Sequence, residues 1–225
     1  MGKLTIYHGS SDIIEVPVFG KGKAYNDYGQ GFYCTEHIEL AREWACSEGV
    51  NGYANRYEIE SDDLRILNLL SERYNILNWL ALLMYHRKGR LSSPISRRGR
   101  EYLIQNFLPD FESYDVIVGY RADDSYFSFA RSFLSNEISL FQLGYAMRLG
   151  KLGEQFVLKS KEAFESIQYI GYTVADHAVY YAKRKARDDE ARAAYLKELE
   201  KEDMNGIFMR DIVREEMKQD DPRLR

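Results

Sequence analysis

The fold of this chain is decided by the stretches YHGS at residues 7–10 and DYGQGFYCT at residues 27–35. The apolar run from Leu4 to Tyr7 predicts a strand. A histidine and a glycine follow it, so a hydrogen-bonding ring and a bare backbone emerge together at a sheet edge. In the second stretch, two glycines allow a tight turn before an aromatic pair. We interpret the two stretches as the walls of a site for a flat, nucleotide-like ligand.

These stretches resemble the first two motifs of the ADP-ribosyltransferase superfamily, in the form shared by poly-ADP-ribose polymerases and diphtheria-type toxins. Residues 8–10 match the first motif, and residues 31–33 match the second. The second stretch and the helical pattern after it are more similar still to a bacterial family of uncharacterised proteins, DUF3990, that is grouped with those transferases. The resemblance is strongest over residues 4–46 and thinner over residues 54–158.

The resemblance implies NAD as the substrate and a role for each matching residue. In the family, the histidine that matches His8 hydrogen-bonds the ribose of the adenosine half. The backbone of the glycine that matches Gly9 holds the nicotinamide carboxamide, and a side chain there would block the approach. We expect Tyr33 to stack on the nicotinamide ring, with Tyr28 as a second wall and Ser10 of the first motif as a further binding residue.

Several of these residues also have a purely structural interpretation. A histidine after a strand is often a structural residue whose hydrogen bonds are made within the fold. Phe32 and Tyr33 could both belong to the core. Since successive strand side chains point to opposite faces, only one of this pair can face a cleft. Asp27 is interpreted as a turn residue that bonds backbone amides rather than as a ligand.

The third family motif is a glutamate on a later strand, which accepts a hydrogen bond from the nicotinamide ribose and steadies positive charge as the glycosidic bond breaks. The matching segment here is GEQFVL at residues 153–158. Phe156 and Leu158 share a strand face with Glu154, so that face should look into the core and Gln155 into the cleft. Strand parity therefore favours Gln155 over Glu154, and both are candidate catalytic residues. Three other acids could assist a glutamine: Asp123, Asp124 and Glu137.

Composition predicts a cytoplasmic protein without a membrane anchor. Charged residues make up 29% and hydrophobic residues 45% of the 225 residues, which suits a soluble globule. The net charge of −4 gives no general attraction to nucleic acid or anionic membrane. Cys34 and Cys46 are too few and too poorly spaced for a metal site and suit a reducing compartment, and the first residues lack a long apolar run. One basic cluster is interpreted as a solvated loop, with a nucleic-acid contact as the alternative: Arg87, Lys88, Arg90, Arg97, Arg98 and Arg100.

The order of elements predicts an α+β fold, because strands are scattered among helices of unequal length without regular alternation. The resemblance implies split antiparallel β-sheets around an NAD cleft, with helical insertions. We place an ADP-ribosyltransferase-like domain at residues 1–172 and a helical C-terminal extension at residues 173–225. In that extension, a long charged helix should fold back on the domain or bind a partner. Helix starts are expected at Thr35, Ser71 and Asn136.

We therefore predict an enzyme of the mono-ADP-ribosyltransferase type that takes NAD as a substrate and passes ADP-ribose to a protein or nucleic-acid acceptor. The resemblance also implies a bacterial toxin–antitoxin or phage-defence role, with a small neutralising partner protein. The alternative is a catalytically weak member that binds NAD or ADP-ribose as a sensor or interaction module, because a glutamine lacks the charge of a carboxylate.

Overall fold

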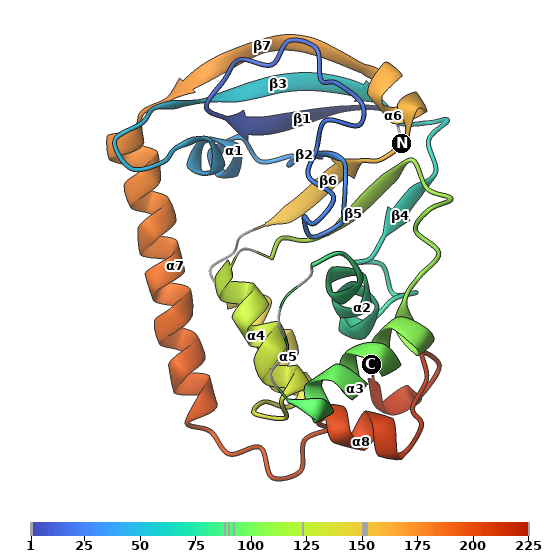
Figure 1. Cartoon of the computed structure of the whole chain (residues 1–225). Coiled ribbons are helices and arrows are strands. Elements are labelled where there is room, and N and C mark those ends of the chain that lie inside the picture. Colours follow the sequence, from blue (N-terminus) through green and yellow to red (C-terminus); the bar gives the residue numbers. More distant parts are fainter. Residues whose placement is uncertain are drawn as a thin grey trace. The chain divides into compact units, whose positions relative to one another are not determined.

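The computed structural model describes residues 2–87, 89, 91, 93–122, 124–149 and 153–224, with the backbone alone for residues 124–126. The fold is α+β, with two β-sheets and a long helix in the C-terminal part (Figure 1). The chain forms two compact units. The first comprises Met1–Asn68, Asp110–Arg121 and Leu152–Arg187, and the second comprises Leu69–Pro109, Ala122–Lys151 and Asp188–Arg225. Compactness does not decide where a functional domain ends, so the boundary after residue 172 stays a prediction.

The first unit holds both sheets. β1 (Lys3–Ser10), β3 (Gly52–Glu60) and β7 (Ile167–Ala175) form an antiparallel sheet in the order β1-β3-β7, with β7 at its outer edge (Figure 1). The second sheet has the order β2-β6-β5-β4. Its strands are β2 (Phe32–Cys34), β4 (Ile66–Asn68), β5 (Val116–Tyr120) and β6 (Glu154–Leu158). Because β4 runs parallel to β5, this sheet is mixed, and the expectation of two antiparallel sheets was wrong for it.

Among the described residues, one backbone bridge joins the two sheets. The Tyr7 amide donates to the Thr35 carbonyl at 2.8 Å, and the Thr35 amide donates to the Tyr7 carbonyl at 2.9 Å. Beyond this bridge β1 continues to Ser10 while β2 runs back to Phe32, so the strands part. Residues of both sheets share one hydrophobic cluster, in which Phe156 and Leu158 lie as strand parity predicted. Its buried members are Ile6, Phe32, Cys34, Tyr57, Ile59, Val116, Phe156, Leu158 and Ala163.

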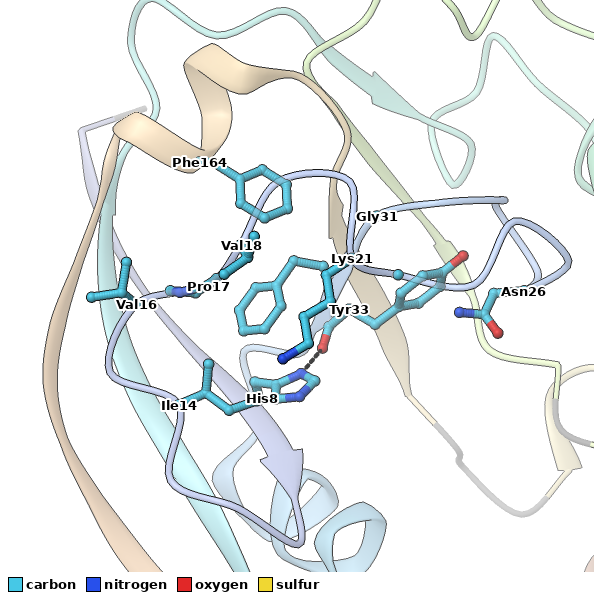
Figure 2. A pocket seen from close by; sticks show the side chains of 12 residues that line it. His8, Ile14, Val16, Pro17, Val18, Lys21, Asn26, Gly31, Tyr33 and Phe164 are labelled. Carbon is cyan, nitrogen blue, oxygen red and sulfur yellow. Dashed lines mark hydrogen bonds between the residues drawn. The ribbon is translucent and has the colours of Figure 1, made fainter.

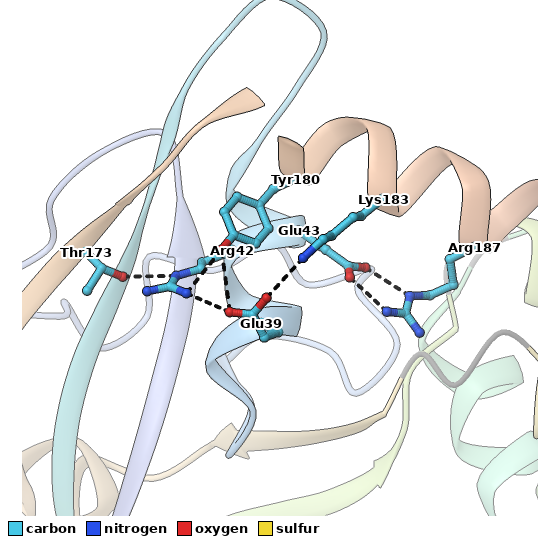
Figure 3. Close-up of polar contacts among 7 residues, drawn as sticks. All are labelled: Glu39, Arg42, Glu43, Thr173, Tyr180, Lys183 and Arg187. Atoms are coloured by element: carbon cyan, nitrogen blue, oxygen red, sulfur yellow. Dashed lines mark hydrogen bonds and ion pairs between the residues drawn. The ribbon is translucent and has the colours of Figure 1, made fainter. Parts of the chain in front are cut away.

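Helix α7 (His177–Leu199) begins directly after the edge strand, and its residues 177–187 belong to the first unit. They dock on α1 (Ile38–Ala45) through charged side chains (Figure 3). Arg187 makes a two-point ion pair with Glu43, with Nε–Oε2 at 3.0 Å and Nη2–Oε1 at 2.8 Å, although Glu43 is only 3% exposed. The surrounding hydrogen bonds join Glu39, Arg42, Thr173, Tyr180 and Lys183. The prediction that this segment folds back is confirmed for residues 177–187.

The second unit is helical. It contains α2 (Ile76–His86), α3 (Pro94–Phe107), α4 (Asp124–Leu134), α5 (Leu140–Ala146) and α8 (Met209–Arg214), with the rest of α7 and a short 3₁₀ turn at Pro222–Leu224. One further short helix, α6 (Lys161–Glu165), belongs to the first unit. Neither α4 nor β4 was expected from the sequence.

Three predicted helix starts were wrong, and local hydrogen bonds explain two of the corrections. Asn75, not Ser71, caps α2, because its side chain accepts from the Leu77 amide at 2.9 Å. Ser139 caps α5 and accepts from the Gln142 amide at 3.2 Å, whereas Asn136 adopts a left-handed turn with φ of 62°. Helix α1 follows His37 rather than Thr35.

The predicted auxiliary acids and basic cluster are only partly described. Lys88, Arg90 and Asp123 lie outside the described residues, and so does the side chain of Asp124. Glu137 lies in the second unit, where it accepts hydrogen bonds from the hydroxyls of two serines, Ser132 and Ser135. No role at a site follows for it.

Replacing Arg187 by alanine should lower the free energy of unfolding by about 3 kcal/mol, the lower end of the range for breaking a buried ion pair, because Arg187 itself keeps some access to water. The cost arises because the Glu43 carboxylate stays buried without its partner. Arg192→Ala on the same helix removes an exposed pair with Asp188 and should cost well under about 1 kcal/mol. Urea unfolding of the three proteins measures both values, and equal losses would contradict the assignment.

Candidate functional site

A pocket of about 360 Å³ lies in the first unit where β1 and β2 part (Figure 2). His8, Phe32, Tyr33 and Phe164 line it, together with the loop between the two strands. Its walls are mostly apolar, and the polar groups come from His8, Lys21 and Asn26. A mostly apolar pocket with a few convergent polar groups is the usual form of a small-molecule site.

The tautomer of His8 is fixed by one hydrogen bond. Its Nδ1 lies 2.6 Å from the Tyr33 carbonyl oxygen, which can only accept, so Nδ1 carries the proton. Nε2 of the neutral ring is then a hydrogen-bond acceptor. Burial lowers the pKa of His8 below its ordinary value, although the Tyr33 carbonyl opposes this shift. At neutral pH the ring is therefore suited to accept a hydrogen bond from a hydroxyl group.

Phe32 and Tyr33 both line the pocket, but their side chains point to opposite faces of β2, as strand parity predicted. The Phe32 ring stacks on the His8 ring with centroids 4.3 Å apart and also belongs to the core. The Tyr33 ring points the other way, and its hydroxyl donates to the Gly29 carbonyl at 2.6 Å and accepts from the Tyr28 amide at 3.0 Å. These bonds hold the ring of Tyr33 at a fixed angle to the strand.

Three predicted binding residues do not line this pocket: Gly9, Ser10 and Tyr28. Tyr28 is fully buried, and its hydroxyl donates to the Tyr120 carbonyl at 2.5 Å. Ser10 ends β1, and its hydroxyl oxygen accepts from the Asp12 amide at 3.1 Å. Tyr28 and Ser10 shape the chain around the pocket rather than its walls.

Gly9 has a structural reason for being glycine that the sequence did not reveal. A Cβ at this position would lie 2.1 Å from the Ala41 carbonyl oxygen and 2.9 Å from the Ala45 nitrogen, because α1 packs directly against β1 here. The predicted reason, close approach of a ligand, stays a prediction.

The backbone of Gly9 faces the gap between the sheets. Hydrogen-bonding direction alternates along a strand, and Tyr7 turns its N–H and C=O to Thr35. Gly9, two residues on, turns its own N–H and C=O the same way. Neither group bonds to any residue that the structure describes. A donor and an acceptor therefore lie side by side, open to a ligand.

Gln155 lies on the same face of the second sheet as Tyr33. Tyr33 is paired with Val157, and residues two apart on a strand share a face, so Gln155 is a diagonal neighbour of Tyr33 at about 7–8 Å. Gln155 is only 6% exposed, and within the described part of the chain its Oε1 has no hydrogen-bond partner. Glu154 is exposed at the start of β6. Neither residue lines the pocket that contains His8.

The loop between β1 and β2 is held by buried polar groups. Asn55, fully buried on β3, accepts from the Ile14 amide at 3.0 Å and donates to the Asp12 carbonyl at 3.1 Å. Lys159 donates to the carbonyls of Tyr28 and Gln30, and burial lowers its pKa to about 8. It is still largely protonated at neutral pH, so its charge reinforces these bonds.

Sequence reasoning missed several residues at the site. Lys21 and Phe164 line the pocket (Figure 2). Trp44 on α1 carries the Arg121 guanidinium 4.1 Å above its ring. An unpatterned loop and a short helix contribute Lys21 and Phe164, so no periodicity could have indicated them.

Neither metal binding nor a membrane span is indicated within the part of the chain that the structure describes. That part holds no group of three or more histidine, cysteine or acidic side chains placed for a metal ion. It also has no helix that is long and apolar enough to cross a membrane. Cys34 and Cys46 are buried and free, and burial raises the pKa of each thiol.

A family model described as "Protein of unknown function (DUF3990)" matches residues 4–169. Comparison with curated proteins and with solved structures gives no match. The expected relation to DUF3990 is thus confirmed over most of the chain. The wider relation to ADP-ribosyltransferases stays a prediction.

The stability of the protein should fall as the pH drops below about 6.5. Because burial lowers the pKa of His8, the unfolded chain binds a proton more readily than the folded chain in that range, and the free energy of unfolding therefore rises with pH there. Chemical unfolding at about one pH unit above and below 6.5 measures this dependence. His8→Gln should flatten it, and an unchanged pH dependence in that variant would contradict the role of His8.

Gly9→Ala should destabilise the protein by about 1–3 kcal/mol, because the new methyl group collides with the backbone of α1. Gly144→Ala in α5 is the matched control. Its Cβ meets no atom closer than 3.9 Å, so it should raise stability by about 0.5–1 kcal/mol. Thermal and urea unfolding measure both changes, and a neutral Gly9→Ala would argue against tight packing of α1.

Proposed function

The chain belongs to the DUF3990 family, and we propose that its first unit binds NAD across the gap between the two sheets and transfers ADP-ribose to an acceptor. The finer fold description, an ADP-ribosyltransferase-like arrangement of split sheets around an NAD cleft, is part of this proposal. It is supported by the single bridge at Tyr7 and Thr35, beyond which the strands part beside a pocket.

The observation that carries the proposal is the open backbone of Gly9. A primary carboxamide such as that of nicotinamide carries one acceptor oxygen and an amide donor, which match the free N–H and C=O of one residue. The register of the bridge, continued two residues along each strand, places Gly9 opposite Tyr33, a residue with an aromatic ring, across the gap. An amide on a flat ring fits this combination.

Each remaining group then has a defined task. His8 presents Nε2 to a ribose hydroxyl, and Tyr33 offers its ring face to the nicotinamide. Gln155 presents its unpartnered Oε1 to a hydroxyl of the reacting ribose. The bond between the ribose carbon and the nicotinamide nitrogen breaks with its electron pair on nicotinamide, and the acceptor forms the new bond to that carbon and loses a proton. The protein contributes position and hydrogen bonds.

The neutral amide of Gln155 predicts a slow reaction. Positive charge develops on the ribose carbon as the bond breaks, and a carboxylate at close range would stabilise it by a few kcal/mol, about 4 kcal/mol at 4 Å with an effective dielectric constant of 20. A glutamine accepts the hydrogen bond without this charge. Replacing it by glutamate adds the charge at the same position.

Gln155→Glu should increase the rate of nicotinamide release from NAD, and Gln155→Ala should decrease it. The expected increase is about tenfold or more, because a small part of the electrostatic gain above suffices for it. The measurement is release of nicotinamide by the purified full chain, with cell lysate as the source of acceptor. Thermal unfolding of each variant checks that it is folded.

Glu154→Ala is the matched control, because Glu154 is adjacent in sequence but exposed. It should leave the rate unchanged. If Glu154→Ala abolishes nicotinamide release while Gln155→Ala preserves it, the assignment of Gln155 is wrong and Glu154 takes the family's glutamate position.

His8→Ala should weaken NAD binding in calorimetry, and unchanged affinity would count against the site.

A second candidate function is a sensor that binds NAD or ADP-ribose without cleaving it. The uncharged Gln155 favours this candidate, since binding and orientation need no carboxylate. The same assays separate the two functions. Calorimetric binding without nicotinamide release, in both the wild-type chain and Gln155→Glu, would support the sensor.

A further inference from the structure

The edge strand β7 presents an open backbone over nine residues, IQYIGYTVA, that include no charged side chain and no proline. No other strand in the described part of the chain covers its outer side. Soluble proteins usually blunt such an edge with lysine, proline or a covering segment. A β-bulge near Ile170 interrupts the first half of β7, which leaves the run from Gly171 to Ala175 regular.

The register of the sheet shows which backbone groups are open. Tyr7 turns its N–H and C=O away from β3, so its neighbour His8 turns them toward Asn55 on β3. The backbone N–H and C=O of Asn55 thereby bond to β1. They cannot also bond to Tyr172, the partner of Asn55 on β7. Tyr172 and Val174 therefore point their N–H and C=O groups to the open side of β7.

We propose that β7 pairs with β7 of a second copy of this chain, antiparallel and centred on Thr173. In this register, Tyr172 of each copy exchanges both backbone hydrogen bonds with Val174 of the other. The two Thr173 residues form the closely spaced pair between them. The contact is isologous and closes on itself, as in a two-fold dimer.

The chemistry of the strand argues for a second copy as the occupant. An uncharged strand can pair with itself antiparallel without placing like charges opposite each other, and facing threonines are a favourable cross-strand pair. Tyr172 is 49% exposed and Val174 is 58% exposed, and the Tyr53 ring packs edge-to-face on Tyr172 at 5.4 Å. Pairing brings these apolar groups of both copies together on one face of the joined sheet.

A single cysteine at the centre tests the register. Thr173→Cys should form a disulfide-linked dimer under mild oxidation, because the closely spaced pair has Cα atoms about 4.5 Å apart, within the range of a disulfide. The two native cysteines are buried and should not compete. Gln168→Cys, exposed on the same strand but without a facing copy of itself in this register, should stay monomeric. Failure of Thr173→Cys to crosslink, or equal crosslinking by Gln168→Cys, overturns the register.

Val174→Lys tests the association without any crosslink. It places an ammonium group at the edge and should convert the wild-type dimer into a monomer in analytical ultracentrifugation of the full chain. Val179→Lys is the matched control, since Val179 is an exposed valine on α7 and should leave the dimer intact. A wild-type chain that stays monomeric at every concentration overturns the proposal, and so does a dimer that Val174→Lys leaves unchanged. None of these outcomes depends on NAD binding.

Discussion

The first unit depends on one exchange of backbone hydrogen bonds, between Tyr7 and Thr35. This exchange connects the two sheets, and because it is a single bridge, the strands part immediately beyond it. His8 then spans the parting strands with its side chain, through the hydrogen bond from Nδ1 to the Tyr33 carbonyl. A side-chain hydrogen bond, instead of a ladder of backbone hydrogen bonds, connects the two strands there. The backbone groups beyond the bridge therefore stay open to a ligand.

Buried polar groups keep this gap in shape. Asn55 binds the loop that leaves β1, and Lys159 binds the turn that leads into β2. Helix α1 lies directly behind Gly9, and the Glu43–Arg187 pair ties that helix to α7. A buried ion pair of this kind adds little net stability compared with apolar packing, but breaking it is costly, so it fixes the position of α1 more than it stabilises the fold.

Strand parity and local motifs predicted what depends on neighbouring residues. They placed His8 and Tyr33, though not Gly9, at one pocket, and they directed Phe156 and Leu158 into the core. They could not predict that Phe32 stacks on His8, because that contact joins side chains of two strands that have parted. The short strand β4 pairs with β5, far along the chain, and nothing in its own three residues indicates it.

The same register accounts for both open stretches of backbone in this unit. Hydrogen-bonding direction alternates along every strand, so the bridge at Tyr7 decides which residues of β1, β3 and β7 point toward each other. At one side of the sheet it leaves Gly9 with an unused donor and acceptor, enough for a single carboxamide. At the other side it leaves the backbone N–H and C=O groups of Tyr172 and Val174 open. These two residues lie two apart on β7, a spacing that suits pairing with another strand instead of a small molecule. Both proposed contacts therefore depend on one alignment of three strands, because the register decides which backbone groups point away from the sheet.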